Sequence, residues 1–135
     1  MTEAEVLDIL RGHFENLFPK ICSTCGRRYA TLRDYILNTK RRGPARSYDA
    51  DLGQWETNAP IGSLAYADCS CGSTLALSTD GMALPQRKAL LSWVRLETER
   101  RGVTPSALLE GLRDNLRAQV LSERSSEAKR GPQGT

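Results

Sequence analysis

The chain has 135 residues, of which 39% are hydrophobic, 26% are charged and 6% are aromatic, and its formal net charge is +3. This length favours one domain, or one small domain with helical extensions, and the scarcity of aromatic residues means that the core rests mainly on aliphatic side chains. No apolar run approaches the roughly 20 residues that a membrane-spanning helix needs, and the acidic, periodic N-terminus is unlike a secretory signal, so we expect a cytoplasmic protein.

The N-terminal segment, residues 1–19, predicts one amphipathic helix over residues 2–18. Thr2 and Glu5 have the spacing of a capping box, in which each side chain binds a free backbone N–H of the first turn. Apolar residues then recur near the 3.6-residue period of a helix until Pro19, which is expected to end it. These apolar residues are Val6, Ile9, Leu10, Phe14, Leu17 and Phe18.

Residues 20–82 predict a domain of small β-elements that carries an insertion over residues 38–58. Within this domain, residues 63–69 and 73–79 have the pattern of two paired strands, because apolar and small polar residues alternate along the second of them. The stretch "CSCG" lies at the tip of this predicted hairpin.

The middle of this region predicts three further elements. Thr31 is placed to cap a short helix over residues 31–38. The polar, basic residues 38–47 contain a Gly-Pro pair and are expected to form an exposed loop. Residues 46–58 are expected to form a β-hairpin, with Tyr48 and Trp55 on either side of its turn.

The C-terminal part, residues 83–122, predicts a helical hairpin. The first helix is expected over about 85–101, with Pro85 at its start and Gly102 just past its end. The second begins after Thr104, a favoured N-cap residue, and its leucines keep one face apolar to about residue 122. The polar tail, residues 123–135, is expected to be disordered.

The four cysteines occur as two close pairs, each followed by glycine, in the stretches "CSTCG" and "CSCG". They are Cys22, Cys25, Cys69 and Cys71. Cytoplasmic thiols are kept reduced, so this pairing points to a metal rather than to disulfides. Four thiolates complete a tetrahedral shell, which predicts one structural Zn²⁺ held by these four residues. Gly26 and Gly72 permit the tight turns that such pairs need.

These two stretches resemble the two knuckles of a zinc ribbon, a family in which each knuckle lies at the tip of a β-hairpin and both hold one zinc ion. The resemblance covers mainly residues 20–80. It departs from the family in the single spacer residue of the second knuckle and in the long segment between the knuckles. It implies an α+β fold with a small β-hairpin core, to which the sequence adds an N-terminal helix and a C-terminal pair of helices.

Other interpretations of the cysteines remain open at this point. They are an iron–sulfur cluster, a thiol switch or disulfide pair, and buried cysteines without a ligand. The single histidine, His13, is interpreted as a packing or surface residue of the first helix, because the cysteines already fill the metal shell. The chain has no phosphate-binding glycine loop, nucleophile elbow or HExxH motif, so we expect no enzymatic activity.

Basic residues gather between residues 27 and 46, where Asp34 is the single acidic residue. We consider Arg27, Arg28, Lys40, Arg41, Arg42 and Arg46 as candidate nucleic-acid contacts. Tyr29, Tyr35, Tyr48 and Trp55 are candidate stacking residues. The alternative is a solvated basic surface without a partner.

Residues 97–116 also resemble, more weakly, the two helices of ribbon–helix–helix regulators. The apolar faces of the C-terminal helices are expected to pack on the rest of the domain or on a second subunit, which favours a homodimer. The function expected from the sequence is that of a non-enzymatic zinc-binding regulatory or adaptor protein that acts through protein contacts. The alternatives are a transcription-related nucleic-acid-binding protein and a redox sensor that uses its thiols and zinc.

Overall fold

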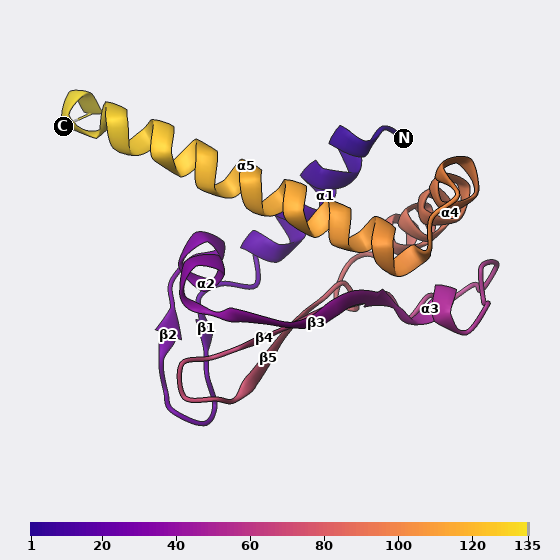
Figure 1. Cartoon of the computed structure of the whole chain (residues 1–135), viewed down its shortest axis with the longest axis horizontal. Helices are drawn as coiled ribbons and strands as arrows, with labels where there is room; N and C mark the ends of the chain where they lie inside the picture. Colours follow the sequence, from indigo (N-terminus) through magenta and orange to yellow (C-terminus); the bar gives the residue numbers. More distant parts are fainter. Residues whose placement is uncertain (135) are drawn as a thin grey trace.

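A computed structural model describes residues 1–134, with side chains described for residues 1–122. The fold is α+β, as expected, with the elements shown in Figure 1. In chain order they are α1 (Glu3–Glu15), β1 (Lys20–Ile21), β2 (Arg28–Tyr29), α2 (Leu32–Asn38), β3 (Lys40–Ser47), α3 (Tyr48–Asp51), β4 (Ser63–Asp68), β5 (Thr74–Ser78), α4 (Leu84–Arg101) and α5 (Pro105–Gly134). No helix in the described residues is long and apolar enough to cross a membrane.

The main sheet has three antiparallel strands in the order β3-β4-β5, and β1 and β2 form a separate two-stranded hairpin. α5 lies along β3 on one face of the main sheet, and α1 crosses behind α5 on the same side (Figure 1). The buried residues form one continuous core that includes α1, both sheets and the C-terminal helices. The leucine stripe of α5, from Leu108 to Val120, is buried in this core by the chain itself.

The hairpin expected over residues 63–79 is confirmed. Ala67 on β4 lies opposite Leu75 on β5, and both side chains are buried on the helix-covered face. Because side chains alternate along a strand, the residues next to Ala67 on β4 and next to Leu75 on β5 point to the opposite face of the sheet, here called the open face. This second face carries Tyr66 and Leu64 from β4, with Lys40, Arg42 and Arg46 beside them on β3.

The helix boundaries follow the caps that the sequence predicts. Thr2 and Glu5 form the capping box of α1, and the hydroxyl of Thr31 accepts from the N–H of Asp34 at the start of α2. Gly102 ends α4 in a left-handed conformation with φ of 66°, and Thr104 caps α5 by accepting from the N–H of Ala107. α1 ends at Glu15, one turn before the expected boundary.

The loop expected over residues 38–47 is wrong, because Lys40–Ser47 form strand β3. The register shifts between Arg42 and Arg46, so the Gly-Pro pair lies in a bulge. In this bulge the backbone of Ala45 bonds to side chains of α5. Its N–H donates to Glu110 (2.6 Å), and its carbonyl accepts from the hydroxyl of Ser106 (3.1 Å). β3 is therefore held to α5 by polar contacts. It lacks the alternation of apolar residues by which a strand is predicted from sequence.

The β-hairpin expected over residues 46–58 is also wrong. Residues Tyr48–Asp51 form the short helix α3, which Ser47 caps. The returning chain is held by a buried side chain instead of a strand ladder. The carboxylate of Asp49 accepts hydrogen bonds from the N–H groups of Ile61 and Gly62, both at 2.9 Å. The tail expected to be disordered, residues 123–135, falls in the last part of α5, which runs to Gly134, beyond the residues whose side chains are described.

Replacing Leu108 with Ala tests the packing of α5. Leu108 is 4% exposed in the common core, so we expect the free energy of unfolding to fall by about 2–5 kcal/mol. Leu96 on α4 is 65% exposed, and its replacement by Ala should change stability by less than about 0.5 kcal/mol. Urea unfolding at constant m-value measures both. Equal effects of the two changes would contradict this packing.

Candidate metal centre

The first cysteine pair lies at the tip of the β1–β2 hairpin. β1 and β2 are antiparallel, with Lys20 opposite Tyr29 and Ile21 opposite Arg28. Two backbone hydrogen bonds close the turn between them: the N–H of Cys22 donates to the Arg27 carbonyl (2.9 Å), and the N–H of Gly26 donates to the Cys22 carbonyl (2.8 Å). This turn brings both thiols to the end of the hairpin.

The second pair lies at the tip of the β4–β5 hairpin and repeats this pattern with one residue fewer. The N–H of Cys69 donates to the Ser73 carbonyl, and the N–H of Gly72 donates to the Cys69 carbonyl, both at 2.8 Å. Gly26 and Gly72 have φ of +77° and +93°, and open space surrounds the position of a Cβ at each. Each position therefore favours glycine for its backbone conformation rather than for lack of room.

The two turns bring the four sulfur atoms within 4.8 Å of one another. Cys22 Sγ lies 3.7 Å from Cys71 Sγ, and Cys25 Sγ lies 3.7 Å from Cys69 Sγ. A zinc–sulfur bond of about 2.3 Å in a tetrahedron places sulfurs about 3.8 Å apart. The donor set and its spacing therefore fit one tetrahedral metal ion. Each hairpin contributes one buried thiol, from Cys22 or Cys69, and one exposed thiol, from Cys25 or Cys71.

A buried tyrosine on β2 contacts this cluster. The hydroxyl of Tyr29 donates to Cys69 Sγ at 2.9 Å, and the residue is completely buried. The guanidinium of Arg27 lies over the Tyr29 ring, 4.9 Å from its centroid. Groups that donate hydrogen bonds to metal ligands fix their orientation and tune their affinity. From the sequence, Tyr29 was expected only to be a stacking residue, because nothing in its local sequence signals a contact with a cysteine 40 residues away.

The pKa values of two thiols in the cluster, those of Cys69 and Cys25, are shifted in opposite directions. The backbone N–H of Cys71, and then the hydroxyl of Tyr29, lower the pKa of the Cys69 thiol to about 6. The Arg27 backbone N–H acts to lower the pKa of Cys25, but desolvation and the neighbouring sulfurs of Cys69, Cys71 and Cys22 raise it to about 11. Burial, and then the contact with Cys69, raise the pKa of Tyr29 to about 12, so its hydroxyl stays a donor. Four thiolates at these distances repel one another, and a divalent cation among them offsets that repulsion.

His13 lies apart from the sulfur cluster. Its Nε2 donates to the carbonyl oxygen of Ser78 at 2.8 Å, at the far end of β5 from Cys71. Its ring also packs edge-on against Phe14. In the described residues the one group of cysteine, histidine and carboxylate side chains that could hold a metal ion is the four-cysteine cluster.

The candidate nucleic-acid residues do not form one surface. Arg41 points to α5, where it pairs with Glu110 (3.3 Å) and Asp114 (2.6 Å), and Arg42 pairs with Asp68 (3.0 Å). Arg27 lies over Tyr29, and Arg28 belongs to the other sheet. Lys40 and Arg46 are exposed on the open face of the main sheet. Among the stacking candidates, Tyr29 and Tyr35 are buried, whereas Tyr48 is exposed.

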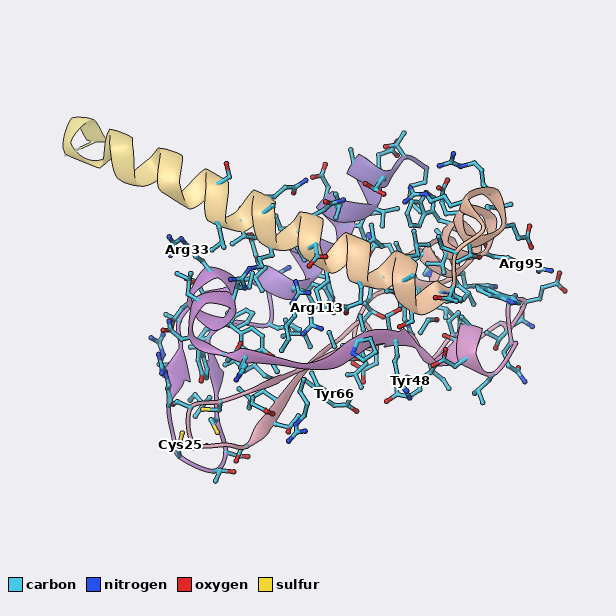
Figure 2. All side chains as sticks on the ribbon, in the orientation of Figure 1. Cys25, Arg33, Tyr48, Tyr66, Arg95 and Arg113 are labelled. Carbon is cyan, nitrogen blue, oxygen red and sulfur yellow. The ribbon has the colours of Figure 1, made fainter. Side chains whose placement is uncertain are left out.

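Figure 2 shows Cys25 with the sulfur atoms at one end of the main sheet, while Tyr48 and Tyr66 project from the sheet on the side away from α5.

Comparisons with protein-family models, with curated proteins and with solved structures find no match for this chain. The cluster is therefore interpreted from its own geometry and chemistry.

Replacing Tyr29 with Phe removes the hydroxyl beside Cys69 and keeps the buried ring. Because this hydrogen bond stabilises the thiolate, we expect the affinity for Zn²⁺ to fall about 10-fold or more. Competition with a chromogenic chelator measures the affinity. Tyr48→Phe is the matched control, because Tyr48 is exposed and its hydroxyl lies 3.5 Å from that of Tyr66, away from the sulfur cluster. Equal affinities in the wild type and both variants would contradict this role of Tyr29.

Proposed function

We propose that the protein is a non-enzymatic zinc-binding module in which Cys22, Cys25, Cys69 and Cys71 hold one structural Zn²⁺. The observation that carries this proposal is the convergence of four free thiols at the tips of two hairpins. Two pairs of sulfur atoms, one from each hairpin in every pair, are 3.7 Å apart within the pair. Four soft thiolate donors favour zinc over hard cations such as Mg²⁺ and Ca²⁺.

A structural role fits this donor set better than a catalytic one. Catalytic zinc sites have three protein ligands and keep a fourth position for water or substrate, whereas four thiolates complete the tetrahedron. The single histidine, His13, is engaged with the carbonyl of Ser78 and is not available beside the cluster as a base. When bound, the ion would join two hairpins that lie more than 40 residues apart, so its binding energy would also be folding energy.

In this proposal the function lies on the surfaces that the metal holds in place. A module of this kind serves as a regulatory or adaptor protein through contacts with a partner. The two exposed ligands, Cys25 and Cys71, place the metal centre at the molecular surface, so a partner bound at the hairpin tips would contact it directly.

Changing any of the four cysteines to Ser tests the metal site. We expect native mass spectrometry to show one zinc per wild-type chain and a loss of this zinc in each variant. Far-UV and near-UV circular dichroism should then show a loss of ordered structure, because the two hairpins of residues 20–80 lose their connection. Ser23→Ala, an exposed change in the first knuckle, should retain the metal. Spectra that stay unchanged after complete metal removal would contradict the structural role.

A second candidate function is the binding of single-stranded nucleic acid on the open face of the main sheet. The observation that favours it is a row of three basic side chains on β3, from Lys40, Arg42 and Arg46, beside Tyr66 on β4. Tyr48 lies next to Tyr66, their hydroxyls 3.5 Å apart. Basic side chains attract phosphates, and exposed aromatic rings provide surfaces on which bases stack. Asp68 is the acidic residue that shares this face, and it pairs with Arg42.

The double change Lys40→Gln with Arg46→Gln tests this candidate. We expect weaker binding of a fluorescent oligonucleotide, with the slope of log K against log salt reduced by about 0.7 for each lost phosphate contact. The control is Lys20→Gln with Lys88→Gln, which removes the same charge from β1 and α4. Absence of binding by the wild-type protein, or equal losses in both double variants, would exclude the sheet face as the site.

A further inference from the structure

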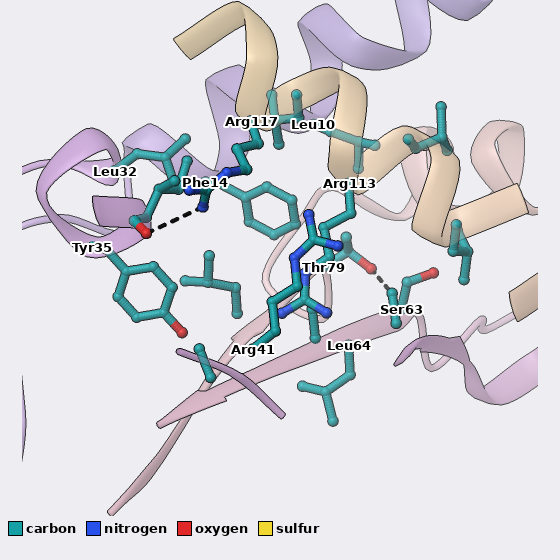
Figure 3. A pocket seen from close by; sticks show the side chains of 18 of the residues that line it. Leu10, Phe14, Leu32, Tyr35, Arg41, Ser63, Leu64, Thr79, Arg113 and Arg117 are labelled. Carbon is teal, nitrogen blue, oxygen red and sulfur yellow. Dashed lines mark hydrogen bonds between the residues drawn. The ribbon is translucent and has the colours of Figure 1, made fainter. Parts of the chain in front are cut away.

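A cavity of about 140 Å³, partly open to solvent, lies between the helix-covered face of the main sheet and helices α1, α2, α4 and α5. Its walls are mostly apolar, with Leu10 and Phe14 from α1, Ala65 from β4, Leu77 from β5 and Leu112 from α5. Figure 3 shows these elements surrounding an open space, into which the ring of Phe14 and the hydroxyl end of Tyr35 point. A cavity of about 150 Å³ with similar walls in another protein stays dry and binds benzene.

One polar group in the cavity wall lacks a partner. Tyr35 is 4% exposed, and its hydroxyl has no hydrogen-bond partner among the described residues. A buried hydroxyl without a partner destabilises the folded state, so such groups are rare in proteins and call for an explanation. Desolvation by burial raises the pKa of Tyr35 to about 12, against a lowering effect of Arg113, so the group is a hydrogen-bond donor at neutral pH.

The three arginines in the wall are already engaged. Arg41 pairs with Glu110 and Asp114, and Arg113 donates to the carbonyls of Gly43 and Tyr66 as well as to Glu110. Arg117 donates to the carbonyl of Ile36 at 3.3 Å. Two of the three guanidiniums thus have carboxylate partners, and the hydroxyl of Tyr35 is the buried side-chain atom of the wall that has no hydrogen-bond partner among the described residues.

We propose that this cavity is a binding site for a compact, uncharged, mostly apolar molecule that carries one carbonyl-type hydrogen-bond acceptor. The volume corresponds to one six-membered ring with a small substituent. The apolar walls provide the contact area, and Tyr35 donates to the acceptor. A single water is a poorer occupant, because a buried water needs two to four polar partners and the walls are mostly apolar. A carboxylate is also a poorer occupant, since Arg41 and Arg113 are already paired with Glu110 or Asp114 and only the charge of Arg117 would be left to attract it.

Binding of acetophenone to the full-length protein tests the proposal. Acetophenone has a ring and one carbonyl, whereas ethylbenzene has the same shape without the acceptor and benzoate has a similar shape with a negative charge. Isothermal titration calorimetry and thermal unfolding should show that acetophenone binds most tightly and raises the Tm. Tyr35→Phe should weaken the binding of acetophenone about 3- to 10-fold and leave that of ethylbenzene unchanged.

A matched pair of alanine variants locates the site. Ala65 lines the cavity, whereas Ala76 on the neighbouring strand points to the opposite face of the sheet. Ala65→Leu should fill the cavity and abolish the binding of both apolar probes, and Ala76→Leu should leave their binding unchanged. If Ala65→Leu does not fold, the Tyr35→Phe comparison still decides, because it keeps the buried ring.

Three outcomes would overturn the proposal. The first is that neither acetophenone nor ethylbenzene binds the wild-type protein. The second is that acetophenone binds equally well to wild type and Tyr35→Phe, which would remove the role of the hydroxyl. The third is that benzoate binds more tightly than acetophenone, which would assign the cavity to anions. The zinc content of each variant, measured in the same samples, keeps this test separate from the test of the metal site.

Discussion

The fold depends on the contact between two hairpin tips that lie far apart in the sequence. β1–β2 has only two residues in each strand, and a hairpin this short has too few hydrogen bonds and too little buried area to be stable alone. It is held against the main sheet where its thiols meet those of the β4–β5 tip, with sulfurs 3.7 Å apart. A metal ion bound there would supply the cohesion that a larger apolar interface supplies elsewhere.

Tyr29 links this cluster to the rest of the core. Its hydroxyl donates to Cys69 Sγ, and its ring packs edge-on against Tyr35, with centroids 5.7 Å apart. Tyr35 in turn packs against Phe18, with centroids 5.5 Å apart, and its hydroxyl end reaches the cavity. Three aromatic residues, in a chain with few of them, therefore form one continuous contact from the sulfur cluster to the helical layer. Such edge-on pairs contribute beyond the area that they bury.

The features that the sequence predicted correctly are governed by local chemistry. The caps at Thr2, Thr31 and Thr104 depend on residues within one helical turn, and the cysteine turns depend on the glycine that follows each pair. The hairpin over residues 63–79 was predictable because its buried side chains alternate. These elements place Cys69 and Cys71 at a hairpin tip, whereas the hairpin that carries Cys22 and Cys25 was implied only by the resemblance to a zinc ribbon.

The features that the sequence missed depend on contacts between distant segments. β3 has few apolar residues because its helix-facing side binds α5 through Arg41 and through the backbone of Ala45, which contacts Glu110 and Ser106. α3 replaces a hairpin because the buried carboxylate of Asp49 holds the chain at Ile61 and Gly62. Neither partner is near in sequence, so no periodicity or turn rule reveals the contact. The hydrogen bond from Tyr29 to Cys69 is missed for the same reason.

The polar contact between β3 and α5 also explains why the basic residues of β3 are split between the two faces of the sheet. Successive residues of a strand point to opposite faces, so Arg41 lies on the helix side while Lys40 and Arg42 lie on the open side. Glu110 contacts Arg41, Arg113 and the N–H of Ala45 together, which neutralises the charge that faces the core. The remaining basic side chains lie on the open face, where Lys40 is opposite Asp68 and Arg46 is opposite Leu64. The run of basic residues in the sequence thus serves two purposes, since part of it joins the sheet to α5 and part of it remains at the surface.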